Sequence, residues 1–220
     1  MTIDREKVKN FWDNRSKLYG SAPIETIVLF KNDTEVIERD KLLKKLLDKY
    51  IKDNQSILDL GCGTGRISIY LSLRAKYVLG VDYSQSLLDI ALKESKDIKN
   101  VEYCVSDISK FSSDQKFDVI VICGLFNYLN NNVFMDTLGV VYKHLKKGGI
   151  VLIKEPLSIG DRKEINNVYS DELSTYYSAI YRTEREVMYN IEKVGLKIIS
   201  SKKIYQHRKE TAIWFIVAKK

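Results

Sequence analysis

The sequence has 220 residues, of which 45% are hydrophobic and 30% charged, and a formal net charge of +7. This length and apolar fraction suit one domain with a buried core and exclude global disorder. No apolar run approaches the roughly 18–20 residues that span a bilayer, and the charged N-terminus has no signal-peptide pattern, so no membrane association is expected.

Two helices are expected ahead of residue 56. Residues 3–19 place Val8, Phe11 and Trp12 on one side of a helix, and a break at residues 20–23 follows it. Residues 35–51 form a strongly amphipathic helix in which leucines interleave with Lys and Glu. These two helices precede the segment in which strands begin.

Strands and helices alternate from residue 56 onward. Short apolar strands are expected at residues 56–60, 77–82, 101–105, 117–122 and 150–153. The connecting helices are expected at residues 67–73, 84–94 and 131–147, with Ser84 as an N-cap and the glycine pair 148–149 as a stop signal. Apolar strands joined by helices predict a parallel sheet covered on both faces.

The last third of the chain departs from this alternation. Residues 157–182 are polar and rich in tyrosine, with no clean period, so no helix or strand is predicted there. Thr183 opens a helix that reaches Val194, and residues 196–205 and 211–218 read as two antiparallel strands around a polar turn. The pattern predicts a seven-stranded, mostly parallel α/β sheet with an antiparallel edge.

A glycine cluster follows the first predicted strand, at the turn where an open α/β sheet binds its ligand. Gly61, Gly63 and Gly65 have G-x-G-x-G spacing, and Arg66 stands where a dinucleotide fingerprint requires a glycine. Asp59 precedes the first glycine by two residues. A carboxylate so close disfavours a pyrophosphate and favours a ligand that bears an ammonium group.

Two further acids end the next strands in order. Asp82 ends the second strand, where a carboxylate can accept hydrogen bonds from both hydroxyls of a ribose. Asp107 follows the third strand and is placed to accept from an adenine amino group. Any one acid at a strand end could be a turn former, but the ordered set predicts a nucleoside site.

With these motifs the sequence resembles the class I S-adenosylmethionine-dependent methyltransferases. The match rests on Asp59 and the three glycines, on Asp82, on Asp107 with Ile108, and on the turn at residues 145–152, where Lys147 replaces the usual proline. The resemblance implies S-adenosylmethionine as cofactor, no metal, and a Rossmann-like doubly wound sheet of order 3-2-1-4-5-7-6 with strand 7 antiparallel. The cofactor-binding residues it implies are Tyr19, Asp59, Gly61, Cys62, Gly63, Gly65, Asp82, Tyr83, Asp107, Ile108 and Cys123.

The resemblance extends to the N-terminal helix. Residues 11–19 are similar to the "FWD-x-RA-x-x-Y" opening of many small-molecule methyltransferases, in which this helix covers the cofactor. Trp12 and Arg15, one turn apart, are predicted to face the substrate, and Tyr19 to approach the methionine end. The alternative for Trp12 and Tyr19 is an aromatic stripe packed on the core.

Catalytic candidates follow the fourth and fifth strands. Asn127, Tyr128 and Glu155 are expected at the cleft, where Glu155 would orient or deprotonate a substrate, or else pair with a basic residue. Tyr181 and Arg182 lie where related enzymes vary their substrate pocket, and Arg182 would bind an anionic group or serve as a surface charge.

One domain, residues 1–220, accounts for these segments. Residues 1–34 form a helical lid, 35–156 the cofactor-binding core, 157–185 a substrate-pocket insertion and 186–220 a closing helix and antiparallel hairpin. The three cysteines, Cys62, Cys104 and Cys123, have no CxxC spacing and indicate the reducing cytoplasm.

The predicted function is methyl transfer to a nitrogen or oxygen atom of a small-molecule acceptor. Residues 161–220 carry 12 basic and 8 acidic groups, more than half of the net excess, so an anionic acceptor is the first class to test. This basic excess also leaves open an RNA or protein methyltransferase, although no RNA-binding module is visible and nucleic acid is not favoured. A third alternative is a non-catalytic partner subunit that only binds the cofactor. The sequence does not determine an oligomeric state.

Overall fold

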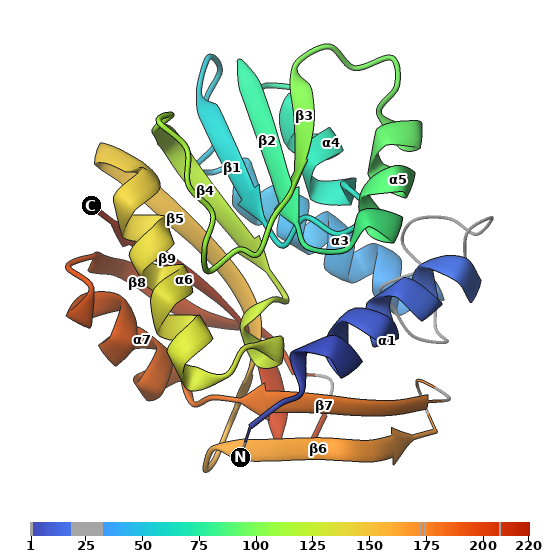
Figure 1. The fold of residues 1–220 in the computed structure, drawn as a ribbon. Helices are drawn as coiled ribbons and strands as arrows, with labels where there is room; N and C mark the ends of the chain where they lie inside the picture. The colour runs from blue at the N-terminus through green and yellow to red at the C-terminus, as the bar shows by residue number, and fades with distance from the viewer. Residues whose placement is uncertain (1, 19–32, 172, 174, 207) are drawn as a thin grey trace.

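The fold, seen in a computed structural model that describes residues 2–18, 33–171, 173, 175–206 and 208–220, is built on a seven-stranded sheet (Figure 1). Its order is β3-β2-β1-β4-β5-β9-β8, and β9 is antiparallel to both of its neighbours. This confirms the predicted order, with β9 as the predicted seventh strand. The strands are β1 (Ser56–Leu60), β2 (Tyr77–Asp82), β3 (Val101–Val105), β4 (Phe117–Cys123), β5 (Leu145–Ser158), β8 (Lys197–Tyr205) and β9 (Thr211–Lys219).

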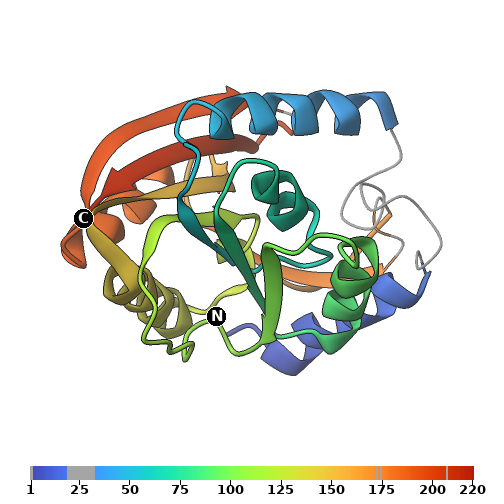
Figure 2. The same ribbon diagram turned by 90° about the horizontal axis from the view of Figure 1, so that it is seen from above.

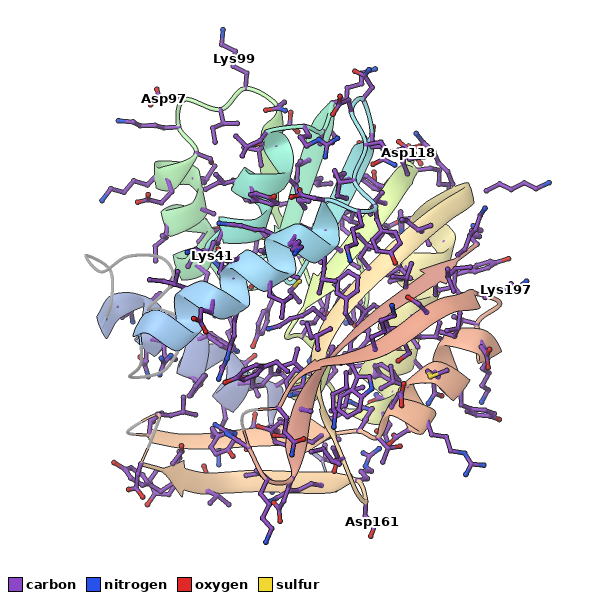
Figure 3. The ribbon with its side chains drawn as sticks, turned by 180° about the vertical axis from the view of Figure 1, so that it is seen from behind. Lys41, Asp97, Lys99, Asp118, Asp161 and Lys197 are labelled. Carbon is purple, nitrogen blue, oxygen red and sulfur yellow. The ribbon has the colours of Figure 1, made fainter. Side chains whose placement is uncertain are left out.

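Helices cover both faces of the sheet, as the apolar strands require. On one face α6 (Asn131–His144) and α7 (Glu184–Lys193) pack against strand residues such as Leu58, Ile120 and Ile153. On the other, α3 (Asp33–Leu47) and α4 (Arg66–Ser72) pack against strand residues such as Ile57, Val119 and Leu152, and α5 (Gln85–Glu94) packs beside them (Figure 2). Figure 3 shows that face with α3, which carries Lys41, lying across it. In the described ranges, no helix has the length and apolar character that a membrane crossing needs.

The carboxyl ends of β1, β2 and β4 meet at one edge of the sheet because these strands are parallel. Helix α1 (Arg5–Leu18) crosses that edge and contacts α5 and the strand β7 (Thr175–Tyr181) (Figure 1). Ile3 and Val8 at its N-terminal end are buried against Ile180. The N-terminal helix therefore lies over the edge where the motif residues gather.

A two-stranded sheet occupies the tyrosine-rich segment, for which no strand was predicted. It consists of β6 (Lys163–Ser170) paired antiparallel with β7. Most of β6 is exposed, so its sequence carries no apolar alternation, and the cross-strand pair of Tyr169 and Tyr176 meets edge-to-face instead. The absence of a buried face explains why this hairpin gave no strand signal.

The helix predicted for residues 131–147 ends at His144, three residues early. Leu145 is almost fully buried and pairs with Phe117 in the sheet, so the chain enters β5 at once. The glycine stop signal lies inside the strand, where Gly148 has φ +79° and a register shift occurs opposite residues 117–119. The strand predicted for residues 150–153 is longer by five residues at each end, and the helix predicted for residues 35–51 ends at Leu47, four residues early. The other predicted helices and strands of the sheet agree with the structure to within two residues at each boundary.

Candidate active site

A cavity of about 1070 Å³, open mouth included, lies at the carboxyl edge of the parallel strands under α1. Most of the predicted cofactor-binding residues line it: Asp59, Gly61, Cys62, Gly63, Asp82, Tyr83, Asp107, Ile108 and Cys123. Of the other candidates, Trp12 and Tyr128 line it as well. Trp12 and Tyr128, which are 116 positions apart in the chain, therefore line the same cavity.

The glycine turn forms the floor of this cavity. The amides of Gly61 and Cys62 both donate to the carbonyl of Val81, at 2.8 and 3.1 Å, which ties the turn to β2. Gly63 has φ +55°, and a Cβ placed there would meet no atom within 4 Å, so its backbone faces open space. Backbone atoms can thus approach a ligand closely at Gly63.

Gly65 differs from the other two glycines because it does not line the cavity. It precedes α4 with φ +74°, and a Cβ there would lie 2.8 Å from the Cβ of Ala91 and closer still to Tyr103. The structure favours a packing role for Gly65, as the residue that lets α4 approach α5, over the predicted contact with a ligand.

Two buried carboxylates stand side by side at the cavity. Asp82 accepts hydrogen bonds from the amides of Gly63 at 2.9 Å and Ser84 at 3.0 Å, and burial raises the pKa of Asp82. Asp59, 1% exposed, accepts from the Ser68 hydroxyl at 2.7 Å. Burial first, and then the neighbouring Asp82, raise the pKa of Asp59 to about 7. Such a pair favours a cationic or hydroxyl-bearing ligand.

Asp107 lies at the opposite side of the cavity and is held from α1. Arg5 forms an ion pair with it at 2.9 Å, and the amide and hydroxyl of Ser109 donate to it at 3.0 and 2.8 Å. Burial opposes ionisation there, but the bonds from Ser109 and Arg5 outweigh it and lower the pKa of Asp107. Arg5 was not predicted, since nothing in the sequence brings it to a carboxylate 102 residues away.

Polar contacts also fix α1 to the edge of the sheet, one just before its start and one near its middle. Before α1 begins, the amide of Ile3 donates to the side chain of Asn130 at 2.6 Å, and Asn130 donates back to the carbonyl of Ile3 at 2.8 Å. Further along, Asp13 accepts a hydrogen bond from the hydroxyl of Ser84, the N-cap of α5. These contacts make α1 a cover whose position is set at several points.

Tyr128 is the catalytic candidate that lines the cavity. Its ring meets that of Trp12 edge-to-face at 5.3 Å, so α1 and the turn after β4 close on each other through this pair. Asn127 is 5% exposed and Glu155 is fully buried, and neither lines the cavity. Of the three candidates, Tyr128 is therefore the one in position to touch a bound molecule.

Glu155 instead supports the turn that carries Tyr128. One oxygen accepts from the amides of Leu125 at 2.6 Å and Phe126 at 3.1 Å, at the start of the short 3-10 helix η1 (Phe126–Tyr128). The other oxygen is buried and has no hydrogen-bond partner among the described residues. Burial raises the pKa of Glu155 to about 7.

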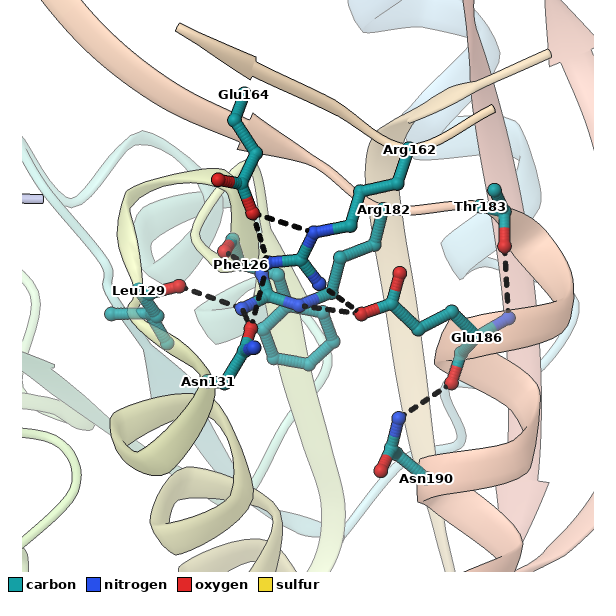
Figure 4. A network of polar contacts seen from close by, with 9 residues as sticks. All are labelled: Phe126, Leu129, Asn131, Arg162, Glu164, Arg182, Thr183, Glu186 and Asn190. Carbon is teal, nitrogen blue, oxygen red and sulfur yellow. Dashed lines mark hydrogen bonds and ion pairs between the residues drawn. The ribbon is translucent and has the colours of Figure 1, made fainter. Parts of the chain in front are cut away.

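Arg182 binds the backbone carbonyls of the same turn (Figure 4). The guanidinium is 1% exposed and donates to the carbonyls of Phe126 and Leu129 and to the side chain of Asn131, at 2.8, 2.8 and 2.9 Å. It also faces Glu186 at 3.6 Å. The two alternatives predicted for Arg182, an anion ligand and a surface charge, both disagree with this burial.

Arg162, which precedes β6, joins the same network. It contacts Glu164 and Glu186 and donates to the side chain of Asn131 at 2.9 Å (Figure 4). Asn131 thus receives a hydrogen bond from each of the two arginines. The network ties the base of the β6–β7 hairpin to α6 and α7, beside the turn that lines the cavity.

Two of the remaining candidates, Arg15 and Tyr181, do not line the large cavity, whereas Cys123 does. Arg15 is buried, with its guanidinium 5.8 Å from the ring of Phe11, and does not line the cavity. Tyr181 lines a separate cavity at the base of the hairpin. Burial raises the pKa of Cys123 to about 12, so this cysteine remains a thiol rather than a nucleophile. Tyr19 lies outside the described residues.

Sequence reasoning missed several residues that line the cavity. They are Arg5, Val8, Thr64, Arg66, Ile67, Leu87, Gly124, Leu125 and Leu129. Thr64 and Arg66 sit inside the glycine motif, so their position next to the named glycines was a usable signal. Leu125 and Leu129 follow β4, where small apolar residues carry no distinguishing pattern.

Comparisons with known proteins agree with this geometry. Residues 51–211 match a family described as "Methyltransferase domain". The chain is 33% identical over 156 residues to a ribosomal protein L11 methyltransferase from Acetivibrio thermocellus, a match that covers 68% of this chain and 47% of that protein. It is 25% identical over 208 residues to phosphoethanolamine N-methyltransferase 1 from Triticum aestivum, covering 91% and 41%. The chain thus spans less than half the length of either relative.

Among solved structures the chain is similar to the N-methyltransferase NodS from Bradyrhizobium japonicum WM9 in complex with S-adenosyl-L-homocysteine. The TM-score is 0.68 at 16% identity, and the match covers 96% of this chain and 98% of that one. At this identity the likeness establishes a shared fold.

Proposed function

We propose that this chain, which belongs to the class I S-adenosylmethionine-dependent methyltransferases, transfers the methyl group to a nitrogen or oxygen atom of a small molecule held between α1 and β7. Its cofactor is S-adenosylmethionine, which supplies the reactive methyl carbon. The protein's own task is to align the acceptor with that carbon and to exclude water. The acceptor, the acceptor atom and the residue roles below are parts of the proposal.

The observation that carries the proposal is a second, smaller cavity beside the first, of about 290 Å³ with its open mouth included. It lies between α1 and β7, and its walls include Phe11, Tyr176 and Tyr177. Val8 and Tyr128 line both cavities, so the two share a wall at the turn after β4. A narrow hollow walled by aromatic rings suits a small molecule better than the surface of a folded protein or an RNA strand.

The residues of the larger cavity fit the cofactor by their chemistry. We assign Asp82 to the ribose hydroxyls and Asp59 to the ammonium group, because both carboxylates are buried and face the cavity. Gly63 leaves room for close approach, and Asp107 with Ile108 would border the adenine. Gly61, Cys62, Tyr83 and Cys123 complete the lining.

Tyr128 is assigned to the acceptor, with Glu155 and Arg182 as the groups that position it. A neutral amine needs no base to attack a methyl group, and an alcohol would need one. Glu155 accepts two amide hydrogen bonds at the turn and is separated from the cavity by it, so we assign it positioning rather than proton removal. Asn127, buried in the same turn, is assigned the same role.

Relatives support more than one class of acceptor. The wheat protein's name gives a phosphorylated small amine, and the bacterial protein's name gives a ribosomal protein. The higher identity to the second keeps protein methylation as the competing function, while the size of the cavity beside Tyr128 favours the first. The cysteines are free thiols, which supports a cytoplasmic site for the reaction.

Labelled methyl transfer tests the proposal. The protein and S-adenosylmethionine with a radioactive methyl group are incubated with a cell extract separated into metabolites and macromolecules. We expect label in the metabolite fraction, and none when Asp82→Ala replaces the wild type. Label confined to a protein would instead favour the L11-type function, and label confined to RNA would contradict both.

A further inference from the structure

A third cavity, of about 560 Å³ with its open mouth included, lies at the base of the β6–β7 hairpin, where β9 begins. Tyr177 lines both this cavity and the second one, just as Val8 and Tyr128 line both the first and the second. Tyr181, the last residue of β7, also lines it. A row of cavities thus runs from the cofactor site past Tyr128 and Tyr177 to the hairpin base.

The far cavity is basic. Its lining includes Lys163, Arg208 and Lys209 against one acid, Glu210, with which Lys163 forms an ion pair. Arg208 lies 3.5 Å from the hydroxyl of Tyr181. This cavity accounts for part of the positive excess carried by residues 161–220. A cavity with a net positive lining attracts anions.

Thr211, the first residue of β9, gives an independent sign of a ligand. It is 4% exposed and lines the cavity, and its hydroxyl has no hydrogen-bond partner among the described residues. A buried hydroxyl without a partner costs free energy, so native proteins rarely retain one unless something binds to it. An oxyanion in the cavity would accept its proton. Burial raises the pKa of Tyr181 to about 12, so a second hydroxyl remains a donor there.

We propose that this basic cavity, formed by Lys163, Tyr181, Arg208, Lys209 and Thr211, binds an anionic group of the methyl acceptor. The acceptor is then an extended molecule with its nucleophile beside Tyr128 and a phosphate or carboxylate beyond Tyr177. This inference rests on the proposed function, because it takes the acceptor to be a small molecule. It adds the chemical class of that molecule and the residues that select it.

Binding of inorganic phosphate tests the site directly. Phosphate is titrated by calorimetry at low ionic strength into protein saturated with S-adenosylhomocysteine, so that the cofactor cavity is filled. We expect saturable binding that Arg208→Gln weakens by about tenfold or more and that Thr211→Val, which removes only the hydroxyl, weakens several-fold. Acetate in place of phosphate tells whether a phosphate or a carboxylate fits better.

Lys197→Gln is the matched control, because it removes one positive charge at the other end of β8. Lys197 begins that strand (Figure 3) and Arg208 follows its end in the chain. The nine residues of β8 span roughly 26 Å. This variant should bind phosphate as the wild type does. No phosphate binding, or equal weakening by Lys197→Gln and Arg208→Gln, would overturn the proposed site.

Methyl transfer separates this inference from the proposed function. For a small acceptor found in the screen, Arg208→Gln and Thr211→Val should raise KM more than they lower kcat, and only when the acceptor bears its anionic group. Transfer with KM unchanged in both variants would overturn the anion site and leave the proposed function standing. Specific phosphate binding without transfer to any small molecule would overturn the acceptor role and the proposed function together.

Discussion

Asp59 is a buried acid with a raised pKa, so a bound ligand can change whether its carboxyl group is ionised. It lines the cofactor cavity with Asp82 beside it, and its pKa in the free protein is about 7. An ammonium group placed next to it would favour the ionised form and lower that pKa. Cofactor binding should therefore release a proton when the pH is below about 7.

We expect the affinity for S-adenosylhomocysteine to fall as the pH drops below 7, by up to about tenfold per pH unit. Calorimetry from pH 5.5 to 8 measures this, and repeating it in buffers of different ionisation enthalpy counts the released protons. Asp59→Asn should bind more weakly at pH 8 and lose the pH dependence. A wild-type affinity that stays constant from pH 5.5 to 7.5 would contradict the assignment.

Glu155 offers a second test at the scale of one residue, between a structural and a catalytic role. Glu155→Gln keeps an oxygen for the amides of Leu125 and Phe126, whereas Glu155→Ala leaves both N–H groups buried without an acceptor. We expect the alanine variant to lose about 2–4 kcal/mol of unfolding free energy and the glutamine variant less than about 1 kcal/mol.

Denaturant unfolding measures the stabilities of these variants, and kcat is compared in parallel. Glu155→Gln should keep kcat within a few-fold of the wild type if Glu155 only positions the turn. A drop in kcat of about a hundredfold or more at unchanged stability would make Glu155 a general base instead.

The acids that line the cavity could be predicted from the sequence, but the buried side chains that hold the turn after β4 could not. Asp59 and Asp82 end strands, and strand ends follow from apolar runs. The role of Arg182 depends on its burial. The carbonyls to which it donates belong to residues 53 and 56 positions away, and nothing in the sequence indicates that they lie around it. Arg5 was missed for the same reason.

At the scale of elements, two of the three glycines in the turn between β1 and α4, Gly63 and Gly65, are under different constraints. Both have positive φ, where an alanine costs about 1–2 kcal/mol. A methyl group on Gly63 would point into the cavity, and one on Gly65 would overlap Ala91 and Tyr103. Stability and binding should therefore respond differently to the same substitution.

We expect Gly63→Ala to lose about 1–2 kcal/mol of unfolding free energy and to weaken cofactor binding by tenfold or more. Gly65→Ala should lose about 2–4 kcal/mol, because overpacking adds to the backbone strain. Thermal unfolding and calorimetry measure the two effects. Equal stability losses in the two variants would show that Ala91 and Tyr103 move aside without cost.

Burial made the inner strands easier to predict than the hairpin. The strands β1, β2 and β4 lie inside the sheet, so their apolar runs gave their positions almost to the residue. The hairpin of β6 and β7 lies mostly in solvent, and its tyrosines pack across the strands rather than into a core. That hairpin also borders the acceptor cavity, so the part of the site hardest to predict is the part that would select the substrate.

At the scale of the whole molecule, buried ionisable groups set the pH dependence of folding. Burial raises the pKa values of Asp59 and Glu155 to about 7, so the folded state binds their protons more readily than the unfolded state does. The stability they confer is full below about pH 4 and is lost as the pH rises through 7. His144 acts in the opposite sense.

His144 is fully buried and neutral, because its Nε2 accepts from the amide of Ser113 at 3.1 Å and its Nδ1 contacts the carbonyl of Val140 at 2.8 Å. Burial lowers the pKa of His144. Its contribution is therefore present above about pH 6.5 and is lost as the pH falls below that value.

Burial raises the pKa of Asp82 as well, so the carboxylates with raised pKa values outweigh the one histidine, His144, with a lowered pKa. The cofactor-free protein should therefore be more stable at pH 5.5 than at pH 7.5, with a slope of about 1.4 kcal/mol per pH unit for each net proton. Urea unfolding across this range measures it. Asp59→Asn should flatten the slope and His144→Gln should steepen it. A wild type that is more stable at pH 7.5 would contradict this balance.

The place of β9 in the sheet has a consequence for the order in which the chain assembles. This strand lies between β5 and β8 although it follows both in the chain. During synthesis β1 to β5 can pair as soon as they emerge, but the outer edge of β5 remains open for more than 50 residues, and β8 has no neighbour to join. An open apolar strand edge invites pairing with other chains. When β9 is complete it pairs with β5 and β8 together, which leaves neither of these edges open. The nascent protein is therefore most exposed to aggregation just before that strand is made.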